Sequence, residues 1–128
     1  MAEQYGVKHV KIADEMFVLN ENHFLKLCDL LIERNHGFNI WAYARVDTIK
    51  KHHLAKLKAA GVNWLVLGIE SKSKFVRDGV TKGRFAEQDI AKTVQMIRDA
   101  GIYVHANYIF GLPDDDFQTM QETLDLSL

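Results

Sequence analysis

Clusters of charged or turn-forming residues follow four short apolar runs of the sequence. The clusters are Asp14 and Glu15, then Arg45 to Asp47, then Glu70 and Ser71, and finally Gly111 to Pro113. A carboxylate can bind a cationic group through charge-assisted hydrogen bonds, and a guanidinium can bind an anion in the same way. These clusters are therefore the candidates for binding a ligand.

The apolar runs themselves have the length of β-strands and alternate with segments of helical spacing. They occupy residues 7–12, 38–44, 64–69 and 103–110, each after a glycine that can end the preceding helix. This pattern predicts an α/β fold of four consecutive βα units, with strands near 7–13, 38–46, 64–70 and 103–110. The units would form a parallel sheet with helices on one face, as in half of a TIM-type barrel. Because parallel strands share one carboxyl edge, we expect the clusters to converge there.

Helical spacing predicts four helices between and after these strands. Asn20 or Asn22 can cap a helix that ends at Asn35, and Thr48 can cap a second. We expect a third over residues 85–100 and a fourth over residues 114–128, where a proline and three aspartates suit a helix N-terminus. Residues 2–5 resemble the last turn of a helix. A sheet of this kind has two open edges, so we expect residues 1–128 to be a fragment of a larger enzyme.

Alternation along the strands separates a polar face from an apolar one. Bulky or polar side chains share one face of three strands; they are Asn39, Trp41, Tyr43 and Arg45, then Val66, Gly68 and Glu70, then His105, Asn107, Ile109 and Gly111. A barrel interior filled only for packing is rich in valine, isoleucine and leucine. The polar face favours a ligand cavity, and the alternative is that these groups pair among themselves in a packed core.

The composition limits the classes of protein to which this chain can belong. Of the 128 residues, 48% are hydrophobic and 26% are charged, and the formal net charge is −1. This predicts a folded single domain and gives no sign of a nucleic-acid or membrane partner. The single cysteine, Cys28, excludes an intrachain disulfide and suits a reducing compartment. We expect a cytoplasmic protein.

Four strand-end motifs together resemble the radical S-adenosylmethionine (radical SAM) enzymes. The motifs are residues 12–17, 44–47, 68–71 and 109–113, in the order in which that family carries them. The resemblance is strongest to the branch whose members often carry a cobalamin-binding domain, such as the anaerobic magnesium-protoporphyrin IX monomethyl ester cyclases. It implies an iron–sulfur oxidoreductase or methyltransferase that cleaves S-adenosylmethionine reductively, on a (β/α)6 partial barrel of which this chain holds strands two to five.

The resemblance also implies a 4Fe–4S cluster, held in that family by a CxxxCxxC loop after the first strand. This sequence has no such loop, and Cys28 lies on a helix stripe. Because a cluster needs several thiolates, this chain is not expected to hold one or to make the adenosyl radical by itself. Catalysis and any cobalamin would then belong to the full-length protein.

Cofactor-binding positions follow residue by residue from the resemblance. Asp14 and Glu15 match the strand end that contacts the methionine amino group, and Arg45 would pair with the methionine carboxylate or an anionic substrate. The alternatives are turn chemistry for the acidic pair, and an ion pair of Arg45 with Asp14, Glu15 or Glu70.

Two further motifs match family positions that contact mainly the nucleoside part of S-adenosylmethionine. Glu70 and Ser71 match the strand end that meets the ribose hydroxyls or the methionine moiety, and Ile109, Gly111 and Pro113 match the segment along the adenine. The alternatives are a solvated strand exit and a plain turn into a helix.

Other readings of the whole chain stay open. It could be part of another βα-barrel enzyme that binds a phosphorylated or sugar ligand, or a non-catalytic βα assembly module. We expect the rest of its own barrel as a partner, or a second copy through the exposed sheet edges. We interpret His52 and His53 as surface residues, the aspartates 114–116 as helix caps, and the basic residues after Glu70 as a solvated loop; these are Lys72, Lys74, Arg77, Lys82 and Arg84.

Overall fold

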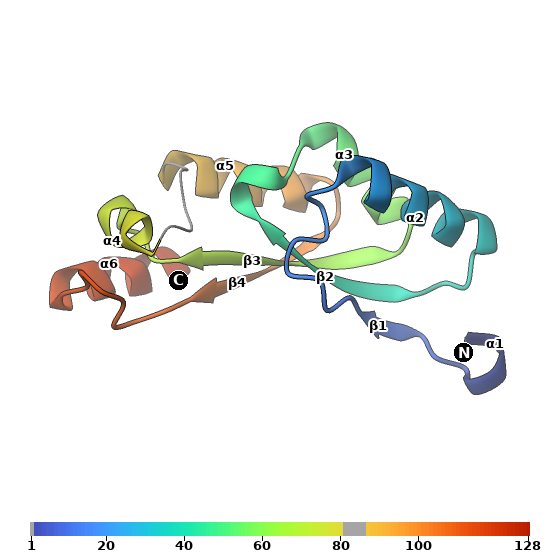
Figure 1. Ribbon diagram of the computed structural model, residues 1–128, viewed down its shortest axis with the longest axis horizontal. Coiled ribbons are helices and arrows are strands. Elements are labelled where there is room, and N and C mark those ends of the chain that lie inside the picture. The colour runs from blue at the N-terminus through green and yellow to red at the C-terminus, as the bar shows by residue number, and fades with distance from the viewer. Residues whose placement is uncertain (1, 81–86) are drawn as a thin grey trace.

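The computed structural model describes residues 2–80 and 87–128. Within these residues the strands β1 (His9–Lys11), β2 (Asn39–Arg45), β3 (Val62–Glu70) and β4 (Tyr103–Tyr108) form one sheet in the order β1-β2-β3-β4. Every neighbouring pair is parallel. The predicted α/β fold of consecutive βα units is confirmed, and all four strand ends point toward one edge of the sheet (Figure 1).

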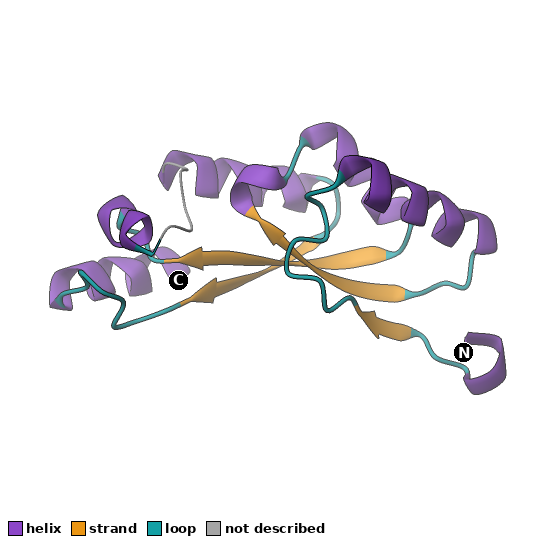
Figure 2. Ribbon diagram, in the orientation of Figure 1, coloured by secondary structure: helices purple, strands orange, loops and turns teal. Residues whose placement is uncertain are grey.

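Three helices cover one face of this sheet. They are α2 (Glu21–Arg34), α3 (Lys51–Ala59) and α5 (Glu87–Asp99), and they lie together above the strands (Figure 2). The core between the two layers is apolar and includes Ile40, Ala42 and Ala44 from β2, Leu65, Leu67 and Ile69 from β3, and Phe24, Cys28, Leu54, Leu57, Ile90 and Ile97 from the helices. Alternation along the strands therefore sends every second side chain into this core.

The opposite face of the sheet carries aromatic and polar side chains. Trp41, Trp64 and Tyr103 lie in register on adjacent strands, and their rings stack at centroid distances of 4.9 and 4.8 Å. His105 lies 5.7 Å from the Trp41 ring. This is the face on which the sequence predicts polar groups, and the aromatic residues occupy its amino-terminal part.

The predicted N-terminal cap is confirmed for α2 but is wrong for α3. Asn20 caps α2 by accepting from the backbone N–H of His23, and Asn35 ends the helix with φ 43°, both as expected. Thr48 does not cap α3. It closes a short 3₁₀ helix, η1 (Val46–Thr48), where its hydroxyl donates to the Arg45 carbonyl at 2.9 Å, and α3 begins at Lys51 without a side-chain cap.

The residues after β3 form a helix where the sequence predicted a loop. Helix α4 (Lys74–Gly79) is capped by Ser73, and Arg77 is buried and donates to the carbonyls of Ser71 and Lys72. The basic cluster is therefore not uniformly solvated. Lys82, Arg84 and the expected helix start at Phe85 lie outside the described residues.

The terminal helices are short and well defined. Helix α1 (Ala2–Tyr5) occupies the expected position, and α6 (Phe117–Ser127) starts later than residue 114. Asp116 caps α6 in a capping box with Thr119, while Asp115 accepts from the N–H groups of Gly111 and Leu112. Across residues 2–80 and 87–128, no helix is both long and apolar enough to cross a membrane.

Candidate ligand-binding site

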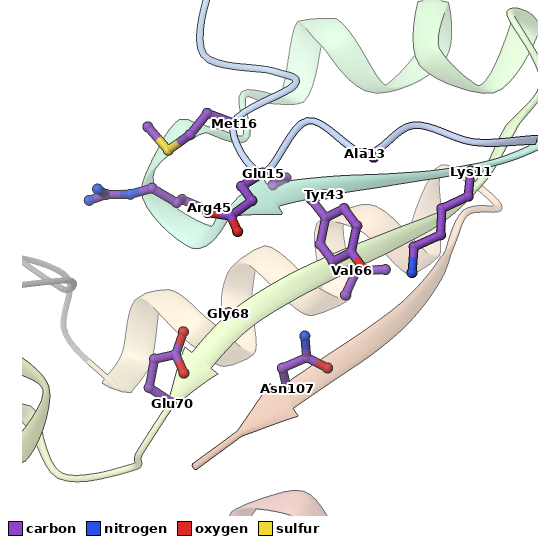
Figure 3. Close-up of a pocket in the computed structure, with 11 residues that line it drawn as sticks. Lys11, Ala13, Glu15, Met16, Tyr43, Arg45, Val66, Gly68, Glu70 and Asn107 are labelled. Atoms are coloured by element: carbon purple, nitrogen blue, oxygen red, sulfur yellow. The ribbon is translucent and has the colours of Figure 1, made fainter. Parts of the chain in front are cut away.

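A pocket of about 450 Å³ opens at the carboxyl end of the sheet, on the face away from α2, α3 and α5 (Figure 3). Its polar and charged lining residues are Lys11, Glu15, Tyr43, Arg45, Glu70 and Asn107. They come from β1, β2, β3, β4 and the loop after β1, so the pocket depends on parallel strands ending side by side. Its size suits a small-molecule ligand.

Glu70 is held in the pocket by an unusual backbone. Its φ is 67°, a left-handed value that is uncommon for a residue with a side chain. The Ser71 N–H donates to the Ile69 carbonyl at 2.9 Å, which closes a γ-turn around Glu70, and the Glu70 carbonyl accepts from the Ile109 N–H at 2.8 Å. A γ-turn with positive φ is strained and is retained where the surroundings fix it. The turn directs the carboxylate back over the sheet.

Gly68 leaves the space that this carboxylate uses. A Cβ at position 68 would lie 2.7 Å from Oε1 of Glu70. Gly68 is paired with Asn107 on β4, and the β3–β4 register shifts between Gly68 and Glu70. Glu70 and Asn107 therefore project into the same part of the pocket, as Figure 3 shows.

Arg45 lies at the opposite side of the pocket and already has an acidic partner. Its Nη2 and Nε atoms donate to the two carboxylate oxygens of Asp47 at 2.6 and 2.9 Å. These hydrogen bonds raise the pKa of the guanidinium above its already high value. The acidic partner is therefore Asp47, and not Asp14, Glu15 or Glu70, which were the alternative partners considered for Arg45.

The two acidic residues after β1 separate. Glu15 lines the pocket, while the Asp14 carboxylate accepts from the backbone N–H of Met16 at 2.9 Å and shapes the turn. Both side chains are exposed. The two residues therefore differ in role. The Glu15 carboxylate lines the cavity, and the Asp14 carboxylate stabilises the loop that carries Glu15.

Ser71 is buried behind the pocket. Its hydroxyl lies 3.2 Å from the Thr123 hydroxyl and accepts from the Ser73 N–H, and Thr123 also accepts from the Lys72 N–H at 3.0 Å. These contacts attach α6 to the end of β3. Ser71 is thus placed to hold the Glu70 turn, and it is not among the residues that line the pocket.

The segment after β4 leaves the same edge of the sheet but does not line this pocket. Ile109 and Pro113 are exposed, and Gly111 has φ 78°, the left-handed conformation that glycine tolerates. The Gly111 N–H donates to Asp115 at 3.0 Å. The segment forms an exposed rim beside the cavity.

The pocket includes Tyr43 and Asn107 from the face predicted to form a ligand cavity, and also Lys11, which was not predicted there. Lys11 reaches over the Tyr43 ring with its Nζ 5.2 Å from the centroid, and Asn107 lines the pocket from β4. Tyr43 and Asn107 lie on the polar strand faces that alternation predicts, which was the available signal. For Lys11 the signal is weaker, because β1 has only three residues and its face follows from its pairing with Trp41.

A sequence profile of the family described as "Radical SAM superfamily" matches residues 1–127. The chain belongs to the radical SAM superfamily. The match runs over all four strands and the polar ends that form the pocket.

Curated relatives in this superfamily are much longer than the chain. An anaerobic magnesium-protoporphyrin IX monomethyl ester cyclase of Rubrivivax gelatinosus is 30% identical over 125 residues, which are 96% of this chain and 22% of that protein. An uncharacterized methyltransferase of Pyrococcus horikoshii is 24% identical over 121 residues, which are 94% of this chain and 26% of that protein. The chain spans about a quarter of the length of the curated relatives it matches.

A solved radical SAM structure shares the fold. It is the radical S-adenosylmethionine methyltransferase TsrM of Kitasatospora setae with cobalamin and a [4Fe-4S] cluster bound, with a TM-score of 0.85 and 19% identity over 98% of this chain and 26% of that one. At this identity the likeness concerns the arrangement of strands and helices. It places this chain's sheet among the parallel strands of a radical SAM fold.

Proposed function

We propose that the pocket at the carboxyl edge binds S-adenosylmethionine as part of a radical SAM oxidoreductase or methyltransferase. The observation that carries the proposal is the convergence of Glu15, Arg45, Glu70 and Asn107 on one pocket in a chain of this superfamily. Acidic, basic and amide groups together match a ligand that bears an amino group, a carboxylate and sugar hydroxyls.

Each pocket residue has a proposed part in holding this ligand. The Glu15 carboxylate accepts from the methionine ammonium, with Asp14 fixing its loop, and Arg45 meets the methionine carboxylate while Asp47 keeps its guanidinium in place. Glu70 and Asn107 hold the ribose hydroxyls. Ser71 keeps the Glu70 turn in position, and Ile109, Gly111 and Pro113 form the rim along which the adenine lies.

The iron–sulfur cluster of such enzymes does not fit the residues of this chain. Its one cysteine, Cys28, is fully buried in the apolar core, and desolvation raises the pKa of the thiol to about 11. Cluster ligation needs several thiolates. We therefore propose that the cluster ligands lie outside these 128 residues, and that the chain alone binds the cofactor without cleaving it. We also propose that any cobalamin binds in a different part of the full-length enzyme.

The sheet edges support a further part of this proposal. Within the described residues β1 and β4 each have one neighbouring strand. An open edge has backbone groups ready to pair with another strand. We propose that these edges pair with the rest of the barrel in the full-length protein, and with a second copy when the chain is studied alone.

Equilibrium dialysis of labelled S-adenosylmethionine against the chain tests the binding proposal. Glu15→Gln removes the proposed ammonium partner and is expected to weaken binding by roughly ten- to a hundredfold, because a charge-assisted hydrogen bond is worth about 1.5–3 kcal/mol. Glu33→Gln removes an exposed carboxylate of α2 outside the pocket and is the matched control. An unaltered chain that retains no label, or equal binding by both variants, would contradict the proposal.

A further inference from the structure

A second group of polar side chains lies between the first turns of α2 and α3, and it shares no residue with the pocket. Oε1 of Glu21 lies 3.2 Å from Nε2 of His52 and 3.1 Å from Nε2 of His53. One ligand-type atom from each of the three residues falls within 4.8 Å of the others. The two helices follow β1 and β2, so the parallel fold brings together residues far apart in sequence.

His53 is the unusual member of this group. The sequence predicted a surface residue, but the side chain is 2% exposed and stands edge-on to the Phe24 ring at a centroid distance of 4.9 Å. Its Nε2 lies near Glu21, yet neither ring nitrogen makes a hydrogen bond with any part of the chain that the structure describes. A buried polar atom without a hydrogen bond lowers stability unless something else binds it. The Nε2 atom lies 3.1 Å from Glu21 Oε1, within the group, but without a hydrogen bond among the described residues.

Glu21 is prepared to act as an anionic ligand there. The Glu21 side chain is 41% exposed, and a carboxyl group in contact with water is ionised at neutral pH. Its Oε2 accepts from Lys50 Nζ at 3.0 Å, which leaves Oε1 for the two imidazoles. Metal-ligating carboxylates commonly accept a hydrogen bond at the oxygen that does not bind the metal, as Oε2 does here.

Two of the three interatomic distances in the group match shared coordination of one ion. Zinc ligands stand about 2.0–2.2 Å from the metal in tetrahedral geometry, so two of them lie roughly 3.3 Å apart. The oxygen-to-nitrogen distances of 3.1 and 3.2 Å are close to that value. His52 is 64% exposed and Glu21 41% exposed, so the open side of the group faces solvent and leaves room for water as a fourth ligand.

We propose that Glu21, His52 and His53 form a binding site for a divalent transition metal of the zinc class. Two imidazole nitrogens and one carboxylate oxygen are a ligand set that zinc takes in proteins. The ion gives the buried Nε2 of His53 its missing partner and links α2 to α3. Because it binds the folded chain, it also raises the chain's stability.

Titration of the chain with Co²⁺, followed by the visible absorption that tetrahedral Co²⁺ gives, tests the site. The chain is expected to bind one equivalent, to lose the absorption when Zn²⁺ displaces Co²⁺, and to melt at a higher temperature with Zn²⁺. His52→Ala alters an exposed position and Glu21→Gln a half-buried one, and both are expected to weaken Co²⁺ binding by at least roughly tenfold. His23→Ala, an exposed histidine of α2 outside the group, is the matched control and should bind as the unaltered chain does.

Circular dichroism shows whether each variant keeps its fold, so a loss of binding by an unfolded chain is not mistaken for support. A folded unaltered chain that gives no tetrahedral absorption would overturn the proposal. The same holds if folded His52→Ala or Glu21→Gln binds Co²⁺ as tightly as the unaltered chain, or if His23→Ala loses as much affinity as they do.

Discussion

The Glu70 carboxylate occupies the space above Gly68 that any other residue at position 68 would fill, since a Cβ there would lie 2.7 Å from Glu70 Oε1. The conflicting atom is the end of a flexible side chain, so the carboxylate can move away from an added methyl group. Its position in the pocket therefore depends on the glycine two residues before it.

Gly68→Ala is accordingly expected to weaken S-adenosylmethionine binding several-fold while the fold stays intact. Calorimetric titration measures the affinity, and thermal melting checks the fold. Gly79→Ala is a closely matched control, because a Cβ at position 79 would lie 2.7 Å from Asp114 Oδ2, a carboxylate outside the pocket. Equal affinities of the two variants would show that the position of the Glu70 carboxylate does not matter for binding.

Gly61→Ala should act on stability. Gly61 has φ 93°, and a Cβ there would lie 2.5 Å from the backbone oxygen of Phe38, which cannot rotate away. Strain of this kind costs about 1–3 kcal/mol, so urea should unfold this variant at a clearly lower concentration than the unaltered chain. Gly37→Ala adds a Cβ that has no neighbour within 4 Å among the described residues, at a similarly positive φ of 64°, and so separates the backbone strain from the clash. If the two variants unfold together, the contact with Phe38 has no energetic consequence.

Much of this fold could be predicted from the sequence because its signals are local. The apolar runs and the glycines after helices gave the strands near their observed positions, and Asn20 gave the start of α2. What could not be predicted depends on contacts distant in sequence. Ser71 turns inward because Thr123 of α6 meets it, and His53 is buried because α2 packs against α3.

The candidate site likewise includes residues that could be predicted from local sequence and residues that could not. Alternation placed Glu70 and Asn107 on one face, since that pattern needs only the strand itself. The separate positions of Asp14 and Glu15 depend on a turn, in which Asp14 accepts from the Met16 N–H. The partner of Arg45 was missed because η1 brings Asp47 back to it.

Cys28 should be unreactive in the folded chain. Burial raises the pKa of its thiol from 9.0 to about 11, so the thiolate that reacts with disulfide reagents is scarce at pH 8. Ellman's reagent should label the thiol only after urea unfolds the chain. Rapid labelling of the native chain would contradict this burial.

The same shift gives a pH dependence of stability. Because the folded-state pKa lies above the unfolded one, the stabilisation by the neutral thiol is fully present below pH 9.0 and is lost as the pH rises toward about 11. The unaltered chain should therefore lose stability between pH 9.0 and about 11, whereas Cys28→Ala has no thiol to titrate. The difference between their unfolding midpoints should accordingly be smaller near pH 11 than at pH 8. A constant difference would mean that the thiol does not titrate differently on unfolding.

The isolated chain should associate through its sheet edges. β1 and β4 each pair with one strand in the described residues, and Tyr103 and Ile109 at the β4 edge are 62% and 45% exposed. Light scattering over a range of concentrations should show the molar mass rising toward a dimer. Ile109→Lys places a charge at this edge and should shift the chain toward monomer. A monomer at every concentration would rule the association out.

The central claim is tested most directly by NMR of the isotopically labelled chain titrated with S-adenosylmethionine. Binding in the pocket should shift the amide signals of residues 13–16, 45, 68–71, 107, 109 and 111 in a saturable way, and leave those of the Glu21, His52 and His53 group in place. Saturable shifts confined to these residues are the result that we predict. A spectrum that does not change, or shifts centred away from the carboxyl edge of the sheet, would contradict the assignment of this pocket to S-adenosylmethionine.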